Sequence, residues 1–212
     1  MDGNGRWAKE RGKERVYGHF EGVESVRAVM EASVEWGIKY VSFYAFSEEN
    51  WSRPDAEVNT LMKLMLDAMV AEVENFREHG VHFIVLGNRA RLSDELNATI
   101  DRIDRETSDC HDLTMILFIS YSGKWDIQQA ALKMAAAGAD SLEPFLVTAG
   151  IPDPDLMIRT SGEQRISNYL LWQLAYAEFV FTPTFWPDFR KEEYRAAIEE
   201  FARRDRRFGK VK

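Results

Sequence analysis

Short runs of β-branched and aromatic residues alternate along this chain with longer runs in which apolar residues recur at helical spacing. The composition of the short runs predicts strands over 38–46, 81–86, 113–119, 156–158 and 179–181. The spacing in the longer runs predicts helices over 21–36, 57–79, 92–107, 125–137 and 191–206. Strands that alternate with helices pair in parallel, because each crossover connection is a helix. The sequence therefore predicts an α/β fold with a central, mostly parallel sheet flanked by helices.

Length and composition indicate one globular domain. The chain has 212 residues, 45% hydrophobic and 29% charged, without an internal repeat or a linker rich in Pro, Gly or Ser. We expect a single domain over residues 1–212. The net charge of −8 argues against a nucleic-acid partner, because phosphate backbones are bound by basic surfaces. A small phosphorylated substrate needs only a local basic pocket and is not excluded.

The cysteine content and hydropathy bear on the compartment. Cys110 is the single cysteine, so an intrachain disulfide is impossible, which fits a reducing cytoplasm. The sequence holds no apolar run of the ~18 residues that a membrane span needs, and its first residues lack a signal-peptide pattern. We expect a cytoplasmic protein.

The first seven residues, Met-Asp-Gly-Asn-Gly-Arg-Trp, have the chemistry of a site for a diphosphate and a metal. Gly3 and Gly5 let backbone N–H groups approach an anion closely, and Arg6 can donate twice to phosphate oxygens. Asp2 offers a hard oxygen ligand for Mg²⁺. A polar, disordered N-terminus is the alternative, since short glycine motifs are weak signals.

A second polar cluster, at 47–53, follows the predicted strand 38–46. It offers a hydroxyl, a carboxylate, an amide, an indole and a guanidinium from Ser47, Glu49, Asn50, Trp51 and Arg53. Ligands gather at the carboxyl ends of the strands in parallel sheets, which favours a functional role. The alternative is an ordinary loop with a helix N-cap at Ser52 or Asp55.

A third cluster covers 159–168, directly after the predicted strand 156–158. Arg159 and Arg165 lie on either side of a glycine-containing turn that also carries hydroxyl groups, a composition suited to binding an anion. The alternative is a solvated loop whose arginines pair with Glu163 and Asp155.

Glu178 lies in an otherwise apolar stretch and must find a partner, either a metal or an arginine.

Two further features are ambiguous on their own. His19, like Arg15, precedes the predicted helix 21–36 and could donate to a diphosphate, although a lone histidine is more often structural. The Met- and Leu-rich helix 57–79 fits either plain core or one wall of an apolar channel.

The glycine-rich segment starts at residue 2, with no strand before it. Because a phosphate-binding βα loop follows a strand, we expect the native chain to extend upstream of Met1.

Taken together, these clusters resemble the cis-prenyltransferase family, which includes bacterial undecaprenyl diphosphate synthases. The resemblance rests on the motifs at 1–8, 18–19, 44–54 and 158–178, and it continues through 186–189 and 206–209. It implies an α/β sheet with a long hydrophobic tunnel, usually in a homodimer. It also implies Mg²⁺-dependent addition of isopentenyl diphosphate units to an allylic diphosphate such as farnesyl diphosphate, with Z double bonds. A lipid product would allow peripheral membrane association.

The resemblance also implies roles for individual residues. Asp2 matches the essential aspartate and metal ligand, Asn50 the proton acceptor and Glu178 the second metal carboxylate. The positions that hold the allylic diphosphate are matched by Gly3, Asn4, Gly5, Arg6, Arg15 and His19. Other substrate-contacting positions are matched by Trp7, Ser47, Glu48, Glu49, Trp51 and Arg53. The isopentenyl diphosphate site is matched by Arg159, Arg165, Ile166 and Ser167. The segment 207–209 resembles an element that reaches the site of a neighbouring subunit.

Some positions depart from the family pattern. Leu117, Phe118 and Ile119 stand where an Asn-x-Ala sequence is common, Asn88 replaces a common aspartate, and the link at 135–141 is short. The first change alters a predicted tunnel wall and leaves the product length open. The alternatives to a long-chain synthase are a synthase of different product length, a non-catalytic scaffold subunit of the same fold, and a phosphatase.

Overall fold

The computed structural model describes residues 1–205. Its helices are α1 (Asn4–Glu10), α2 (Arg15–Glu35), α3 (Asp55–Glu78), α4 (Asp94–Thr107), α5 (Gly123–Ala137) and α6 (Lys191–Ala202). Its strands are β1 (Tyr40–Ser47), β2 (Val81–Leu86), β3 (Leu113–Tyr121), β4 (Leu156–Arg159) and β5 (Glu178–Phe181). Short 3₁₀ helices are η1 (Glu48–Ser52), η2 (Arg89–Arg91), η3 (Glu143–Phe145) and η4 (Trp186–Asp188).

All the strand pairs in this part of the chain are parallel, which confirms the predicted α/β class. Strand β3 lies between β1 and β2, with Leu117 opposite both Phe43 and Val85. Strands β4 and β5 pair separately, with Met157 opposite Phe179. The sequence predicts one central sheet, whereas the described strands form a three-stranded and a two-stranded sheet.

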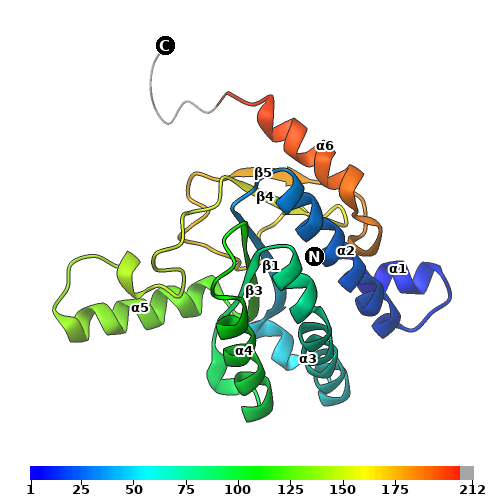
Figure 1. The fold of residues 1–212 in the computed structure, drawn as a ribbon. Coiled ribbons are helices and arrows are strands. Elements are labelled where there is room, and N and C mark those ends of the chain that lie inside the picture. Colours follow the sequence, from blue (N-terminus) through cyan, green and yellow to red (C-terminus); the bar gives the residue numbers. More distant parts are fainter. Residues whose placement is uncertain (206–212) are drawn as a thin grey trace.

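The two faces of the three-stranded sheet bury different cores. Met115, Leu117 and Ile119 of β3 face a large core that includes residues of α2, α3 and α4. Ile116 and Phe118, at the alternate positions, face a smaller cluster with Tyr169 and other residues of the 157–174 region. This alternation is the period of two that a strand requires. In Figure 1, α3 and α4 lie along the same side of the sheet, whereas α5 projects away from it.

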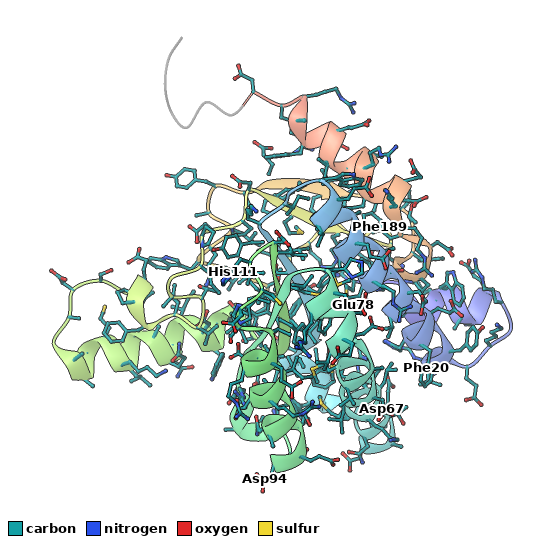
Figure 2. All side chains as sticks on the ribbon, viewed as in Figure 1. Phe20, Asp67, Glu78, Asp94, His111 and Phe189 are labelled. Atoms are coloured by element: carbon teal, nitrogen blue, oxygen red, sulfur yellow. The ribbon has the colours of Figure 1, made fainter. Side chains whose placement is uncertain are left out.

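Side chains from the last third of the chain complete the larger core. Phe189 stacks on Trp186 at 5.7 Å between ring centroids and lies 6.3 Å from the ring of Tyr194 on α6. Figure 2 shows Phe189 between the ribbons of α2 and α6, and Asp94 at the outer tip of α4. Residues after β5 therefore hold α6 against the helix that begins near the N-terminus.

The N-terminal region contains more helix than the sequence predicts. Residues 4–10 form α1 instead of a glycine-rich loop, and α2 begins at Arg15 instead of residue 21. Helix α2 includes Gly18 and Gly22, which are poor helix formers. A Cβ at Gly18 would lie 2.0 Å from the carbonyl oxygen of Asn4, so the glycine permits close contact between α1 and α2.

The polar clusters lie at the carboxyl ends of strands, as predicted. Segment η1 follows β1, the 159–168 loop follows β4, and Ser122 follows β3 and caps α5 by accepting a hydrogen bond from the backbone N–H of Trp125 at 3.1 Å. The predicted end of the last helix at 206 and the 207–209 element lie outside the described residues.

Candidate functional site

A cavity of about 1040 Å³ joins the predicted polar clusters to the core. Strands β1 and β4 line it, and so do α2 and α3. Its polar wall contains Asp2, Gly3, Asn4, Gly5, Arg6, Arg15, His19, Ser47, Asn50, Arg53, Arg159, Arg165, Ile166 and Ser167. These residues come from four separate segments of the chain, and the fold brings them to one space.

Asp2 is tied to the 159–168 loop. Its Oδ2 accepts a hydrogen bond from Arg159 Nη2 at 3.0 Å, and its Oδ1 accepts one from the backbone N–H of Gly3 at 2.7 Å. Its backbone N–H donates to Thr160 Oγ1 at 2.9 Å, and this hydroxyl donates to the Asp2 carbonyl at 2.8 Å. Burial raises the pKa of Asp2, but Arg159, the Gly3 N–H and Arg6 together lower it below its usual value. Asp2 is therefore a carboxylate at neutral pH.

Glycines allow the N-terminal segment to approach its neighbours. Gly3 has φ of 102°, and a Cβ there would lie 2.6 Å from a ring carbon of Phe185. A Cβ at Gly5 would lie 2.9 Å from the guanidinium carbon of Arg15. Glycine at these positions thus lets Arg15 come close to the start of α1.

Arg15 and Arg53 form one cationic group around Glu57. Arg53 Nη1 lies 3.1 Å from Glu57 Oε1, and Arg15 Nη2 lies 3.9 Å from the same oxygen. His19 is nearby: burial and the positive charges of Arg53 and Arg15 lower its pKa to about 4, with Glu57 acting in the opposite direction. At neutral pH His19 is uncharged and two guanidinium groups share one carboxylate, an arrangement that attracts an anion.

A second cationic group consists of Arg6, Arg159 and Arg165. Arg159 Nη1 donates to Ser167 Oγ at 2.7 Å and also to the carbonyl oxygen of Arg165. Arg6 Nη2 lies 3.1 Å from Glu163 Oε1, and Arg165 forms an ion pair with the same carboxylate. The predicted Arg165–Glu163 pair is present, but Arg159 binds Asp2. Three guanidinium groups here share two carboxylates.

The side chains in and beside η1 divide between the cavity and other protein groups. Ser47, Asn50 and Arg53 line the cavity, and Asn50 Oδ1 accepts the backbone N–H of Ser47 at 3.1 Å. Ser52 donates to the Glu49 carbonyl at 2.7 Å. Glu49 accepts a hydrogen bond from Asn168 Nδ2 at 2.6 Å, which joins η1 to the 159–168 loop. Glu48, Glu49 and Trp51 are absent from the cavity lining and bind protein groups instead.

Two other predicted site residues also lie outside the cavity lining. Trp7 is buried, stacks on Tyr17 and donates from Nε1 to Asp188 Oδ1 at 2.7 Å. Glu178 forms an ion pair with Arg204 at 2.9 Å, the alternative that the sequence left open. A substrate contact for Trp7 and a metal role for Glu178 stay predictions.

The residues around Asp2 fit a Mg²⁺ ion that takes one protein carboxylate and otherwise substrate and water oxygens. The Asp2 side chain is 36% exposed, so its oxygens are accessible from the cavity. Within residues 1–205, no group of three or more His, Cys, Asp or Glu side chains could hold a metal.

Beyond the polar wall the cavity is apolar. Leu61, Leu64, Met65, Ala68 and Met69 of α3 line it, as do Phe83 of β2 and Met115 of β3. Leu61 and Met69 are also buried in the larger core. Helix α3 is therefore both core and cavity wall, the two roles that its sequence pattern left open.

Glu57 was not singled out from the sequence. It lies against both Arg53 and Arg15. Glu57 is four residues from the predicted site residue Arg53, and this proximity is a signal that could have identified it. Thr160, whose hydroxyl belongs to the predicted 159–168 cluster, binds both backbone groups of Asp2.

Comparisons with known proteins find relatives along nearly the whole chain. A family model described as putative undecaprenyl diphosphate synthase matches residues 1–209. An isoprenyl transferase of Chlorobaculum tepidum is 46% identical over 100% of this chain and 84% of the relative. A protein of Legionella pneumophila (strain Paris) named ditrans,polycis-undecaprenyl-diphosphate synthase ((2E,6E)-farnesyl-diphosphate specific) is 44% identical over 100% of this chain and 93% of the relative.

Solved structures resemble the whole fold. Lavandulyl diphosphate synthase from Lavandula x intermedia, in complex with dimethylallyl diphosphate, has a TM-score of 0.94 at 33% identity, covering 99% of this chain and 95% of that one. A probable undecaprenyl diphosphate synthase from Campylobacter jejuni has a TM-score of 0.83 at 34% identity, covering 90% of this chain and 92% of that one.

Proposed function

The chain belongs to the undecaprenyl diphosphate synthase family of cis-prenyltransferases, and on that premise we propose that it adds isopentenyl diphosphate units to farnesyl diphosphate with Mg²⁺. The proposed product is a long-chain Z-polyprenyl diphosphate, of the length of undecaprenyl diphosphate, which would serve as a lipid carrier for cell-wall synthesis.

One observation carries the proposal: Asp2 and two arginine groups line the polar wall of a largely apolar cavity. A condensation of two diphosphates needs two anion subsites close together and an apolar space for the hydrocarbon chain. Arg15, Arg53 and neutral His19 suit the allylic diphosphate, together with the 3–6 segment. Arg159, Arg165 and Ser167 suit the isopentenyl diphosphate.

The proposed reaction begins when the bond between C1 of the allylic substrate and its diphosphate breaks. Negative charge grows on the leaving diphosphate. The guanidinium groups of Arg15 and Arg53, together with Arg6 from the other cationic group, stabilise it. Asp2 would hold a Mg²⁺ ion here, and the bound ion would supply further positive charge to the leaving group. The double bond of isopentenyl diphosphate then attacks C1, and the new carbon–carbon bond forms.

Loss of a proton from the isopentenyl unit completes each cycle. Asn50 lines the cavity, and we assign its side chain to accept or relay this proton. Its Oδ1 already accepts the Ser47 N–H, which fixes the orientation of the amide. The lengthened allylic diphosphate then re-enters the cycle, with its tail against Leu64, Met65 and Ala68.

We propose a homodimer and peripheral membrane association through the lipid product on the basis of the family resemblance. The single cysteine fits a cytoplasmic location, which we also propose. Among residues 1–205, no helix combines the length and apolar character of a membrane span. A synthase of shorter product is the second candidate, because the solved structure with a TM-score of 0.94 to this chain is that of a lavandulyl diphosphate synthase.

The test compares Asp2→Ala with Asp67→Ala, which changes an exposed aspartate on α3 that pairs with Lys63. With farnesyl diphosphate, isopentenyl diphosphate and Mg²⁺, Asp2→Ala should lower polymer formation by about 10³-fold or more, since charge stabilisation at the leaving group is lost. Asp67→Ala should act like the unmodified protein. Unchanged turnover in Asp2→Ala would refute the assignment, and release of phosphate alone by the unmodified protein would favour a phosphatase.

A further inference from the structure

Four side chains form a closed ring of interactions behind η1. Arg91 Nη1 lies 3.2 Å from Glu48 Oε2, and Glu48 Oε1 accepts a hydrogen bond from Ser120 Oγ at 2.8 Å. Ser120 Oγ in turn accepts the indole N–H of Trp51 at 2.9 Å. The guanidinium of Arg91 lies over the Trp51 ring at 4.5 Å from its centroid, which closes the ring. We call these residues the Arg91 ring.

The Arg91 ring connects the carboxyl ends of three neighbouring strands. Glu48 and Trp51 belong to η1 after β1, Ser120 lies near the end of β3, and Arg91 belongs to η2 after β2. Ser120 has φ of 53°, an unfavourable conformation for a residue with a side chain. Its carbonyl oxygen accepts the backbone N–H of Asn88 at 2.9 Å, so the strained residue also binds the segment that leads to η2.

None of the four ring residues lines the cavity, whereas Ser47, Asn50 and Arg53 of the adjoining backbone do. The side chains in and beside η1 therefore point two ways. Those of Ser47, Asn50 and Arg53 line the cavity, and those of Glu48 and Trp51 belong to the Arg91 ring. The edge of the Phe46 ring also meets Trp51, at 5.1 Å between centroids. The indole is thus fixed by an aromatic edge, a hydrogen bond and a cation over its face.

We infer that Arg91 is a positioning residue, which through Glu48 and Trp51 holds η1 so that Asn50 and Arg53 face the cavity. The inference rests on the proposed function and adds to it a residue that does not contact the substrate. Glu48 and Trp51 act as anchors of η1 rather than as substrate contacts. A purely stabilising role explains the arrangement less well, because Arg91 is 46% exposed and exposed ion pairs add little to stability.

The experiment compares Arg91→Gln, Arg91→Lys and the control Arg102→Gln. Arg102 lies on α4, is 43% exposed and pairs with Glu106, so it matches Arg91 in exposure and partner type. Misplacing a catalytic segment by about 1 Å can cost 10²-fold in rate. We expect kcat for condensation to fall ~10- to 100-fold in Arg91→Gln, with partial recovery in Arg91→Lys and no change in Arg102→Gln. Melting temperatures should stay within a few degrees of one another.

Two measurements do not depend on turnover, which separates failure of this inference from failure of the proposed function. The first is the ¹⁹F spectrum of protein labelled with 5-fluorotryptophan, in which Trp51→Phe identifies one of six signals. That signal should shift in Arg91→Gln and not in Arg102→Gln. The second is calorimetry with inorganic diphosphate, whose affinity should fall several-fold in Arg91→Gln because Arg53 is no longer held in place.

The inference is overturned if the Trp51 signal and the diphosphate affinity are unchanged in Arg91→Gln. It is also overturned if the signal shifts while kcat and affinity stay at the level of the unmodified protein. Equal loss of folding in both Arg91 variants would assign Arg91 to stability and would likewise contradict it.

Discussion

At the scale of single residues, the site is held ready by ion pairs that a substrate would have to exchange. Asp2 binds Arg159, and Glu57 lies against both Arg15 and Arg53. Each guanidinium already has a carboxylate partner, so a diphosphate would gain charge-assisted hydrogen bonds by replacing or joining that carboxylate. This explains how a chain with a net charge of −8 can offer two anion subsites.

His19 provides a prediction that depends on pH. Its pKa is lowered to about 4 by burial and by Arg53 and Arg15, so the free protein holds it neutral at pH 6. Bound inorganic diphosphate would offset the two arginine charges and raise this pKa. NMR titration of the imidazole, assigned with His19→Gln, should show the rise. A pKa near 6.5 in the free protein, or no response to diphosphate, would contradict the placement of His19 in this subsite.

The protonation of His19 also affects the free energy of unfolding. The folded-state pKa of His19 lies below the ordinary value of 6.5, so the unfolded chain binds the proton more readily. The contribution of His19 to the free energy of unfolding is therefore fully present above pH 6.5. It is lost as the pH falls from 6.5 towards 4. Denaturant unfolding should show a smaller loss of stability across this window in His19→Gln. An identical pH dependence in both proteins would oppose this account.

The residue types of the site were readable from the sequence, but their partners were not. Arg159 and Arg165 were expected in an anion site because they flank a turn after a strand, and both line the cavity. The pairing of Arg159 with Asp2 joins residues 157 positions apart, and local pattern carries no information on such contacts. The sequence left open whether Glu178 binds a metal or an arginine, and Arg204 provides an arginine partner.

At the scale of elements, the packing of α1 on α2 determines the shape of the polar wall. Gly18 and Gly22 let the backbone of α2 approach Asn4 and the Trp186 ring. The Trp186 indole N–H donates to the Gly22 carbonyl at 2.9 Å, and its backbone N–H donates to the Asp2 carbonyl at 3.0 Å. Helix α2, η4 and the Asp2 segment are thus held together by one tryptophan.

Gly18→Ala tests this packing. The added methyl would meet the Asn4 carbonyl oxygen at 2.0 Å, so α1 must move or α2 must bend. Overpacking of this kind costs about 1–3 kcal/mol, and we expect this loss of unfolding free energy despite the higher helix propensity of alanine. The rate of condensation should fall as well, because Asp2 and Arg6 would move with α1.

The control is Glu31→Ala, at an exposed position of the same helix. It should leave both stability and activity within experimental error of the unmodified protein. A Gly18→Ala protein as stable and active as this control would show that α1 does not need the close approach.

These glycines also explain why the N-terminal helices were predicted incompletely. Glycines in a helix interior lower its predicted propensity, so α2 was expected to begin only at residue 21. The reason for glycine here is a contact with another element, which propensity does not describe. By contrast, α4 begins close to the residue that the spacing of its apolar residues predicted. Ser93 caps this helix locally, because its hydroxyl oxygen accepts the backbone N–H of Leu96 at 3.2 Å.

At the scale of the whole molecule, the fold forms one space with a charged wall and an apolar interior. Strands β1 and β4 belong to different sheets, and both line this space together with α2 and α3. The α/β class and the parallel pairing were predictable from the alternation of strands and helices. The division into two sheets was not, because it depends on which distant strands become neighbours.

The apolar interior leads to a prediction about product length. Ala68 lines the cavity, whereas Ala71 is exposed on the same helix. Ala68→Leu should shift the product distribution towards shorter chains by filling space that the growing tail needs, while the first condensation continues. Ala71→Leu, the same change outside the cavity, should leave the distribution as it is. Chromatography of labelled products distinguishes them, and equal distributions in both variants would argue against this wall as the chain-binding surface.

The central claim is that the two arginine groups, Asp2 and the apolar cavity together condense diphosphate-activated isoprenoids. The most direct measurement is chromatography of the products formed from farnesyl diphosphate and radiolabelled isopentenyl diphosphate with Mg²⁺. The account predicts that label appears in polyprenyl diphosphates longer than farnesyl diphosphate and that omission of Mg²⁺ abolishes this incorporation. Release of inorganic phosphate without any lengthened product, or no reaction at all, would contradict it.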